Sequence, residues 1–373
     1  MFRLSNLIKS TLQEQKSRSL DGSIIIWNMT NRCNLLCHHC YSKASANEKE
    51  SLSLEDILKT IPKLKIANIN FVIFSGGEPL LRKDIFEIAQ CMKDNKIMTY
   101  LSTNGTYITQ KNAQKIIDTF NYIGISIDGI GEVHDYFRGQ KGSYDKSIEA
   151  IKTIQKLGGN AGIRFTITKE TESSFYDIFT LAEELNVNKI YISHLVYSGR
   201  GKENLEIDIS KEKRREYVNF MINKAFEYYE NGKDIDIVTG NMEMDAIMLL
   251  KEFEKKYPDF VNSLKNRLKS WGGNSAGYRL GNMDWNGFVK PDPFFPMTIG
   301  NYLEKDFDKI WLDDNNELLK KLREFPRNIK GKCSSCKYID ICNGGSRSRA
   351  YAISGDLWDE DPSCYLTLEE IKG

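Results

Sequence analysis

Apolar residues along the chain follow two alternating patterns. Short apolar runs rich in β-branched residues predict six buried strands, at 23–28, 69–75, 97–102, 121–127, 161–168 and 189–196. Between these runs, apolar residues recur at helical spacing and predict helices at 53–66, 82–95, 109–119, 143–157 and 173–185. Strands that alternate with helices favour an α/β fold with a parallel sheet, here curved into a partial or complete barrel. Functional loops are then expected at the carboxyl ends of the strands.

The pattern changes in the second half of the chain. Two long polar helices are predicted at 210–232 and 242–268, followed by a stretch rich in glycine, proline and aromatic residues. A chain of 373 residues exceeds one ordinary core, so we expect one large and one small domain. The predicted division is an N-terminal amphipathic segment at 1–22, a barrel core at 23–235, a helical connector at 236–270 and a second domain at 271–373.

The charge balance excludes several classes of partner. Lys plus Arg number 52 and Asp plus Glu 51, a formal net charge of +1, so nothing global attracts nucleic acid or an anionic membrane. No apolar run approaches the roughly eighteen residues of a membrane span, and the N-terminal stretch lacks the pattern of a secretory signal. We therefore predict a cytoplasmic protein without a membrane span.

Seven of the eight cysteines form two groups at opposite ends of the chain. The first group follows the first predicted strand and the second lies near the C-terminus: Cys33, Cys37 and Cys40, then Cys333, Cys336, Cys342 and Cys364. Such clustering is typical of metal or iron–sulfur ligation in a reducing compartment. The eighth, Cys91, is interpreted as a small buried apolar residue on a helix.

The first cysteine group leaves one coordination position open. Three thiolates hold three irons of a [4Fe–4S] cube, and the fourth iron is free for an exogenous ligand. The same spacing alone also fits a zinc site completed by His38 or His39. The next predicted strand favours the cube, because it ends in "FSGGEPLL" (74–81). There Gly76 and Gly77 allow close backbone approach, and Glu78 offers an anion to an ammonium group.

This combination of motifs resembles the radical S-adenosylmethionine (SAM) superfamily over roughly residues 20–200. The resemblance implies that the first three cysteines hold a catalytic [4Fe–4S] cluster that binds SAM. An electron from a donor such as ferredoxin or flavodoxin would then cleave SAM to a 5′-deoxyadenosyl radical, which abstracts a hydrogen atom from substrate. The cofactor-binding residues that the resemblance implies are His39, Gly76, Gly77, Glu78, Pro79, Ser126, Asp128 and Arg200.

The C-terminal cysteines have the spacing C-x2-C-x5-C-x21-C, which fits a second [4Fe–4S] cube or a structural zinc. The region resembles the SPASM/twitch extension of radical SAM enzymes, which implies an auxiliary [4Fe–4S] cluster. Asn274, Asp292 and Ser346 stand where the fuller pattern has cysteines, so the resemblance implies that one auxiliary cluster is retained and another lost. The expected fold is therefore a partial (β/α)6 barrel with a small C-terminal SPASM/twitch-like domain.

Nearly end to end, the chain is similar to the tetrapyrrole-tailoring radical SAM proteins of heme d1 and alternative heme biosynthesis. The likeness rests on the opening stretch, on residues 281–314, and on "GKCSSC" and "CNGGSRSRAYAISGDLWDEDPSCYL". It implies a siroheme-derived iron tetrapyrrole as substrate. The substrate would lose peripheral carboxyalkyl side chains by radical carbon–carbon cleavage.

The residues that would hold such a substrate have both functional and structural interpretations. Guanidinium groups bind carboxylates bidentately, and the candidates are Arg138, Arg164, Arg200, Arg279, Arg347 and Arg349, with Arg200 and Arg347 favoured. His194 is a candidate axial ligand to the tetrapyrrole iron or a hydrogen-bonded structural residue. Five aromatic residues can line a flat pocket or form the core of the small domain: Tyr278, Trp285, Phe288, Phe294 and Phe295.

Two alternative functions stay open at this point. Many enzymes with the SPASM extension act on peptides, so the first alternative is a radical SAM peptide maturase. The short stretch before Ser23 leaves no room for the peptide-binding N-terminal domain that would favour it. The second alternative is a non-catalytic iron–sulfur or zinc module for redox or regulation, against which the Gly-Gly-Glu-Pro motif argues.

Overall fold

A computed structural model of the chain describes residues 1–15 and 22–372. Eleven strands within these residues form one sheet in the order β1-β8-β7-β6-β5-β4-β3-β2-β9-β10-β11. The strands are β1 (Phe2–Arg3), β2 (Ser23–Thr30), β3 (Ile69–Gly76), β4 (Met98–Thr103), β5 (Tyr122–Ser126), β6 (Ala161–Ile167), β7 (Lys189–His194), β8 (Asp236–Gly240), β9 (Leu280–Met283), β10 (Phe288–Lys290) and β11 (Gly300–Asn301).

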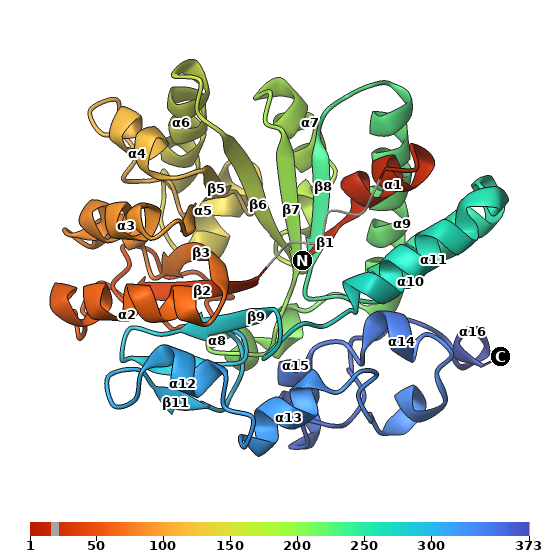
Figure 1. Cartoon of the computed structure of the whole chain (residues 1–373). Coiled ribbons are helices and arrows are strands. Elements are labelled where there is room, and N and C mark those ends of the chain that lie inside the picture. The colour runs from red at the N-terminus through yellow and green to blue at the C-terminus, as the bar shows by residue number, and fades with distance from the viewer. Residues whose placement is uncertain (16–21, 373) are drawn as a thin grey trace.

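The strands from β2 to β8 pair in parallel and curve into the wall of a partial barrel (Figure 1). Side chains alternate between the two faces of this wall. Along β6, Ile163 and Phe165 are buried in the main hydrophobic core, whereas Arg164 between them is only half-buried. The even positions of β6 therefore face the barrel interior. The arrangement of the strands confirms the expected fold, a partial α/β barrel with a C-terminal domain.

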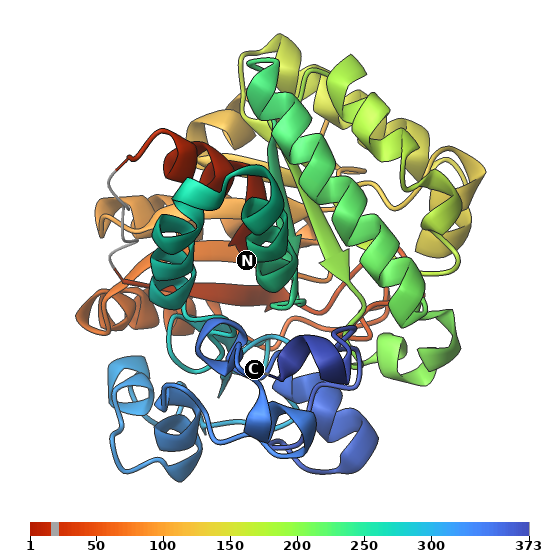
Figure 2. The same ribbon diagram turned by 90° about the vertical axis from the view of Figure 1, so that its right-hand side faces the viewer.

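Helices cover the outer face of the barrel (Figures 1 and 2). The short helices α5 (Glu132–Arg138) and α8 (Arg200–Glu203) lie instead at the carboxyl ends of the strands, where both hydrogen-bond to the loop after β2. The helices on the outer face are α2 (Leu54–Ile66), α3 (Ile85–Asp94), α4 (Ala113–Thr119), α6 (Ser143–Lys156), α7 (Asp177–Glu184) and α9 (Lys211–Glu230). Ser53 and Ser210 cap two of them, because each hydroxyl accepts a hydrogen bond from the backbone three residues later. The six predicted strands and the helices between them are present.

Two features differ from the sequence-based prediction. Residues 236–240, assigned to the helical connector, form β8 beside β7; this strand has only five residues, too few to show a clear period. The helix predicted at 242–268 is two helices, α10 (Asp245–Lys256) and α11 (Val261–Trp271), separated by a 3-10 turn at Pro258–Phe260. Proline lacks the N–H that an uninterrupted helix needs at this place.

The C-terminal region continues the same sheet. Strand β9 pairs in parallel with β2, and β10 and β11 follow in antiparallel pairing. The remaining helices are α12 (Phe307–Trp311), α13 (Glu317–Arg323), α14 (Ile339–Cys342), α15 (Arg347–Ser354) and α16 (Leu368–Ile371). In both ribbon views this region, drawn in blue, lies beneath the barrel, where strand β7 ends.

At the N-terminus, α1 (Leu4–Leu12) packs on its own domain, as its amphipathic pattern predicts. Leu4 and Ile8 are buried in the core that includes residues of α9 and α11. Part of the predicted segment 1–22, residues 16–21, lies outside the described residues.

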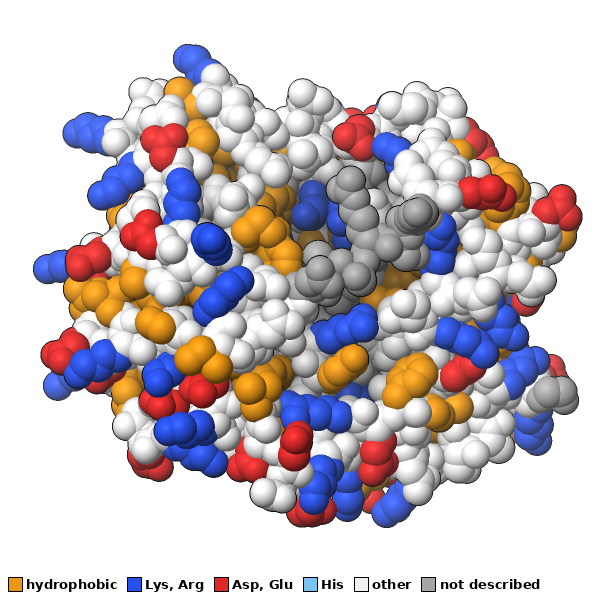
Figure 3. All heavy atoms as spheres, viewed as in Figure 1, with side chains coloured by type: hydrophobic (Ala, Val, Ile, Leu, Met, Phe, Trp, Pro, Cys, Tyr) orange, Lys and Arg blue, Asp and Glu red, His pale blue; other side chains and the backbone are white. Residues whose placement is uncertain are grey.

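Among the described helices, none has the length and apolar character needed to cross a bilayer. Acidic and basic side chains are interspersed over the face shown in Figure 3, in keeping with the near-zero net charge.

Candidate active site and auxiliary cysteine site

The first cysteine group lies in the loop that follows β2 and forms a small buried cluster of its own. Cys33 and Cys37 are 7% and 6% exposed and pack with Leu35 and Ala44, and Cys40 lies against them. The loop is folded back by hydrogen bonds between the Cys33 N–H and the Ser45 carbonyl, 2.9 Å, and between the Ser45 N–H and the Asn31 carbonyl, 3.2 Å. The chain thus brings three thiols together within fifteen residues.

Burial makes two of these thiols, Cys33 and Cys37, poor acids. It raises the pKa of Cys33 to about 12 and raises the pKa of Cys37, although the Arg138 guanidinium opposes the shift at Cys37. Thiolates at this place therefore need a strongly cationic partner such as cluster iron, which replaces the proton.

Of the two histidines that could complete a zinc site with these cysteines, His38 is paired with a carboxylate, whereas the buried His39 Nδ1 has no hydrogen-bond partner among the described residues. His38 Nδ1 lies 2.7 Å from Glu170 Oε2, and the His39 ring stacks on Phe137 with 4.7 Å between centroids. Burial lowers the pKa of His39 to about 4, so this ring is neutral.

The Gly-Gly-Glu-Pro turn at the end of β3 docks on the start of the cysteine loop. The N–H groups of Gly77 and Glu78 donate to the carbonyls of Thr30 and Arg32, each at 2.8 Å. A Cβ atom on Gly77 would overlap the Arg32 carbonyl, which explains the glycine at this position. The turn and the cysteine loop are therefore one rigid backbone unit.

The Glu78 side chain is fully buried and points into the protein. Its carboxylate accepts hydrogen bonds from the Leu80 N–H at 3.1 Å, the Thr103 hydroxyl at 2.8 Å and the Asn104 N–H at 2.8 Å. Burial raises the pKa of Glu78, and these donors oppose the shift. Three of about four acceptor positions of the carboxylate are filled, which leaves one for an ammonium group. The role of Gly76, Gly77, Glu78 and Pro79 in SAM binding stays a prediction.

The two candidates at the end of β5 have different environments. Ser126 alternates with the buried Ile125 and Ile127, so it faces the barrel interior, where a ligand can reach it. Asp128 is fully buried, and both its oxygens are engaged, by the Thr166 N–H at 2.6 Å and by Arg138 at 2.5 Å. A contact between Asp128 and SAM stays a prediction, and within the protein this carboxylate holds an arginine.

Residues that follow β7 also hold the cysteine loop, in addition to the Gly-Gly-Glu-Pro turn. The backbone N–H of Arg200 donates to the Cys40 carbonyl at 2.9 Å, and its side-chain Nε donates to the Cys37 carbonyl at 2.7 Å. Gly199 has φ +56°, and a Cβ atom there would overlap the backbone of Cys40 and Tyr41. Arg200 therefore supports the cluster loop itself. Sequence reasoning missed Gly199, although its place in "SGRG" after a strand was a signal for close backbone approach.

Tyr41 and Phe294 connect the barrel mouth to the C-terminal region. The Tyr41 hydroxyl donates to Asn28 Oδ1 at 2.8 Å, and its ring meets Phe294 edge-on with 5.1 Å between centroids. Phe295 is buried in a separate small core, Tyr278 and Phe288 are exposed, and Trp285 is half-buried. Of the five aromatic candidates, Phe294 is the one placed against the cysteine loop.

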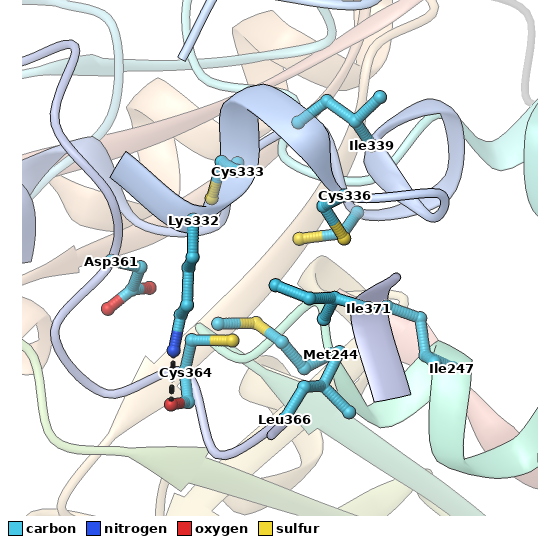
Figure 4. Close-up of a pocket in the computed structure, with 12 residues that line it drawn as sticks. Met244, Ile247, Lys332, Cys333, Cys336, Ile339, Asp361, Cys364, Leu366 and Ile371 are labelled. Atoms are coloured by element: carbon cyan, nitrogen blue, oxygen red, sulfur yellow. Dashed lines mark hydrogen bonds between the residues drawn. The ribbon is translucent and has the colours of Figure 1, made fainter. Parts of the chain in front are cut away.

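The four C-terminal cysteines line one cavity, together with apolar side chains (Figure 4). Its lining includes Cys333, Cys336, Cys342 and Cys364, with Met244, Ile247, Ile339, Leu366 and Ile371. Lys332 closes one side by donating to the Cys364 carbonyl at 3.1 Å. Burial raises the pKa of Cys333 to about 12 and raises the pKa of Cys342 and Cys364. The cavity thus resembles the first cysteine group in its thiol chemistry, with one more cysteine.

A ring of polar side chains brackets Cys364 and ties it to the barrel. On one side, Tyr365 donates to Asp245 at 2.8 Å, and Asp245 lies 3.5 Å from His194 Nε2. On the other side, Ser363 bonds Tyr197, which donates to Asp208 at 2.7 Å. Arg214 closes the ring, bonding His194 Nδ1 at 2.9 Å and Asp208 at 2.8 Å. Both nitrogens of His194 are thus engaged and the residue is 1% exposed, so the axial-ligand interpretation is wrong.

The structure separates the candidate arginines into groups. Arg347 and Arg349 are fully buried: Arg347 donates to the carbonyls of Leu357 and Asp359, and Arg349 pairs with Asp361 at 2.7 Å. The preference for Arg347 as a substrate clamp is wrong, because its guanidinium is consumed by backbone carbonyls. Arg279 lies on the surface over the Tyr278 ring.

Arg164 is different, because its guanidinium lies inside the barrel without an anionic partner. It stacks over the Tyr191 ring with 4.5 Å to the centroid. Among residues 1–15 and 22–372, no carboxylate forms an ion pair with it. Unlike the ion-paired Arg138 and Arg349, Arg164 therefore has a guanidinium on the interior face of the barrel that is open to a ligand carboxylate.

The positions that lack cysteine are filled by a polar network. Asn274 donates to Glu243 at 3.0 Å and accepts from Arg327 at 2.9 Å. Asp292 is buried, and burial raises its pKa to about 6. Ser346 caps α15 by accepting from the Arg349 N–H. These side chains thus form hydrogen bonds and a helix cap within the protein.

Comparison with known proteins agrees with this geometry. The family model of the radical SAM superfamily matches residues 27–182. The pre-heme d1 synthase of Dinoroseobacter shibae is 36% identical, over 99% of this chain and 93% of that protein. The Fe-coproporphyrin III synthase of Methanosarcina barkeri is 37% identical, over 93% of this chain and 89% of that protein.

Solved structures share the fold. Streptococcus suis SuiB bound to its precursor peptide SuiA superposes with a TM-score of 0.73, covering 97% of this chain and 79% of that chain. The sequence identity is 17%, so the likeness concerns the fold alone.

Proposed function

Because the chain belongs to the radical SAM superfamily, we propose that it removes peripheral carboxyalkyl side chains from a siroheme-derived iron tetrapyrrole by radical carbon–carbon cleavage. The observation that carries this proposal is the near full-length similarity to two relatives, at 36% and 37% identity. The names of both relatives refer to heme or porphyrin products. The membership itself makes the protein an enzyme that uses SAM and a [4Fe–4S] cluster.

The residues of the site have defined tasks in this proposal. When bound, the cluster and SAM supply the 5′-deoxyadenosyl radical chemistry. Cys33, Cys37 and Cys40 would hold the cluster, and the clamps formed by the turn after β3 and by Arg200 fix the loop that carries them. A rigid loop matters because hydrogen abstraction requires the reacting carbon to be held within a few ångströms of C5′.

Arg164 is the proposed contact for a carboxylate. The substrate carries several carboxylates, and a guanidinium inside a partly closed barrel binds one more strongly than a solvated guanidinium does. Support comes from the position of Arg164 on the interior face of β6, over Tyr191 and without an anionic partner in the described residues. Ser126, directly paired with it on β5, is the neighbouring hydrogen-bonding group.

The C-terminal cysteines are proposed to hold an auxiliary [4Fe–4S] cluster. Support comes from the four thiols that line one cavity, two of them buried and two half-buried. A full set of four thiolates leaves no iron open, so this cluster would transfer electrons or support the fold instead of binding SAM. A low-potential one-electron protein such as ferredoxin or flavodoxin is the proposed donor.

Binding without turnover tests the proposal. The Soret band of didecarboxysiroheme should change when this tetrapyrrole is added to the anaerobically reconstituted protein. The binding affinity should fall as salt is added, because the contacts are ionic. Arg164→Ala should weaken this binding more than Arg3→Ala, whose side chain is 54% exposed and paired with Asp236. If SAM is cleaved but no tetrapyrrole shifts the spectrum or stimulates 5′-deoxyadenosine formation, the tetrapyrrole proposal fails and short peptides become the substrates to test.

A further inference from the structure

A buried arginine reaches the sulfur of one cysteine in the first group. Arg138, the last residue of α5, donates from one guanidinium nitrogen to Cys37 Sγ at 3.6 Å. Its other terminal nitrogen pairs with Asp128 Oδ2 at 2.5 Å, and the two side chains are 10% and 1% exposed. Burial opposes the charge on Arg138, but Asp128 and Cys37 together outweigh it and raise the pKa of Arg138. The group is therefore a permanent cation.

The same helix end also holds the backbone around Cys37. The Arg138 carbonyl accepts from the Leu36 N–H at 3.1 Å, and the Phe137 carbonyl accepts from the His38 N–H at 3.0 Å. Both neighbours of Cys37 are thus fixed to α5, which keeps the sulfur beside the guanidinium. Asp128 is fixed in turn by the Thr166 N–H.

The three cysteines of the group differ in this respect. Cys33 Sγ accepts from the Leu35 N–H at 3.4 Å, and Cys40 Sγ lies 3.5 Å from the Ser42 hydroxyl, so their partners are neutral. Within the described part of the chain, Arg138 is the one charged side chain that donates to a sulfur of this group. A cation hydrogen-bonded to a cluster thiolate stabilises the more negative, reduced form of the cluster.

We propose that Arg138, held in place by Asp128, is a positioning residue that raises the reduction potential of the cluster at Cys33, Cys37 and Cys40. This inference rests on the proposed function, because it requires a four-iron cluster at those cysteines. The step concerned adds one electron from a low-potential donor to the oxidised cluster, with no bond or proton transferred. Asp128 offsets part of the positive charge of Arg138. The reduction potential of the cluster should therefore lie between the value expected with Arg138 alone and the value expected without this cation.

The sign of the effect separates this role from a structural one. Arg138→Gln removes the cation and should lower the midpoint potential of the cluster. Asp128→Asn removes the counter-charge and should raise it, and Arg138→Lys should give a value between those of the parent and Arg138→Gln. A residue that only supports the loop would change iron content or stability in each variant without opposite shifts of potential.

The test is a potentiometric titration of the reconstituted holoenzyme, followed by electron paramagnetic resonance of the cluster signal that changes when SAM is added. We expect reduction of Arg138→Gln to be at least tenfold less favourable, which is about 59 mV for a one-electron couple. Arg82→Gln is the matched control, because Arg82 is also buried and pairs with Asp84 and Glu50 but donates to no cysteine among the described residues.

Each outcome has a defined meaning. Opposite shifts in Arg138→Gln and Asp128→Asn, with Arg82→Gln at the parent value, establish the proposal. Equal midpoints in parent and variants that carry the SAM-responsive cluster overturn it and leave the proposed function intact. If Arg138→Gln fails to bind the cluster, the shifts in Arg138→Lys and Asp128→Asn decide. A parent protein without a cluster at these cysteines overturns both this inference and the proposed function.

Discussion

Glu78 shows how one buried side chain joins three parts of the site. Its carboxylate ties the turn after β3 to the end of β4 through Thr103 and Asn104, while its backbone N–H holds the start of the cysteine loop at Arg32. A buried carboxylate is tolerated because donors surround it. Glu78 is therefore both a structural link and the expected partner of the SAM ammonium group.

Glu78→Gln should weaken SAM binding and also lower stability. The change removes the negative charge, and the new amide NH2 faces backbone donors that then lack an acceptor, at a cost of about 1–3 kcal/mol. Titration with SAM and thermal unfolding of the reconstituted protein measure the two effects, with the exposed Glu87→Gln as control. Both cluster spectra should persist. Unaltered SAM affinity would assign Glu78 to the turn alone.

Gly199→Ala should displace the cysteine loop. The added Cβ overlaps the backbone of Cys40 and Tyr41, so the loop must move and bind less iron. Gly131→Ala is the matched control, because Gly131 has the same φ of +56° but open space around its Cα. Iron analysis of the two variants after reconstitution distinguishes overlap from backbone strain. Equal iron content in both would contradict the clamp.

Among the helices and strands, hydrophobic periodicity predicted the elements that local sequence encodes. It missed the elements that depend on tertiary contacts. Six strands and their helices were predicted because long apolar runs carry their own period. Strand β8 was missed because it is short and is stabilised by pairing with β7 and β1. The break at Pro258 was overlooked within an otherwise helical pattern.

The candidate site shows the same division. Cysteine spacing predicted which thiols come together, and all of them except Cys364 lie within ten residues of another member of their group. The roles of the arginines were not predictable, because the partners of Arg138, Arg347 and Arg349 come from other elements. A cation beside a motif has the same sequence signature whether it binds a ligand, a carbonyl or a thiol. Arg164 was one of six candidates, and the sequence favoured Arg200 and Arg347 over it, because only the barrel shows that Arg164 lies in the interior.

The polar ring that includes Tyr365 and Asp245 connects the C-terminal region to the barrel. Tyr365→Phe removes the hydroxyl that donates to the buried Asp245 carboxylate, which should lower stability by about 1–3 kcal/mol. It should also reduce iron at the C-terminal cysteines, since Tyr365 follows Cys364. Tyr257→Phe, which removes an exposed hydroxyl near Glu230, is the control. Thermal unfolding and iron analysis check both effects, and a parent-like result for Tyr365→Phe would remove the ring's structural role.

For the whole molecule, the two cysteine sites predict the metal content. Anaerobic reconstitution should give about eight irons per chain, because three and four cysteines each imply a four-iron cube. Replacing Cys33, Cys37 and Cys40 together by Ala should leave about four irons and abolish SAM cleavage. Metal analysis of the parent and the triple variant provides the measurement. Four irons in the parent, with zinc at the other site, would contradict the auxiliary cluster.

The barrel and the C-terminal region act together in the proposed reaction. Barrel strands supply the cysteine loop, the turn with Glu78 and the interior Arg164, and the C-terminal region contributes Phe294 above the loop. The relatives at 36% and 37% identity match over both regions, so the comparison extends to the whole assembly.

The central claim is tested most directly by the mass of the product. The reconstituted protein is incubated anaerobically with didecarboxysiroheme, SAM and a strong reductant, and the tetrapyrrole is analysed by mass spectrometry. The account predicts a tetrapyrrole that has lost carboxyalkyl groups, formed together with 5′-deoxyadenosine and absent when the Cys33, Cys37 and Cys40 variant is used. A tetrapyrrole of unchanged mass, while SAM is still cleaved, would contradict it.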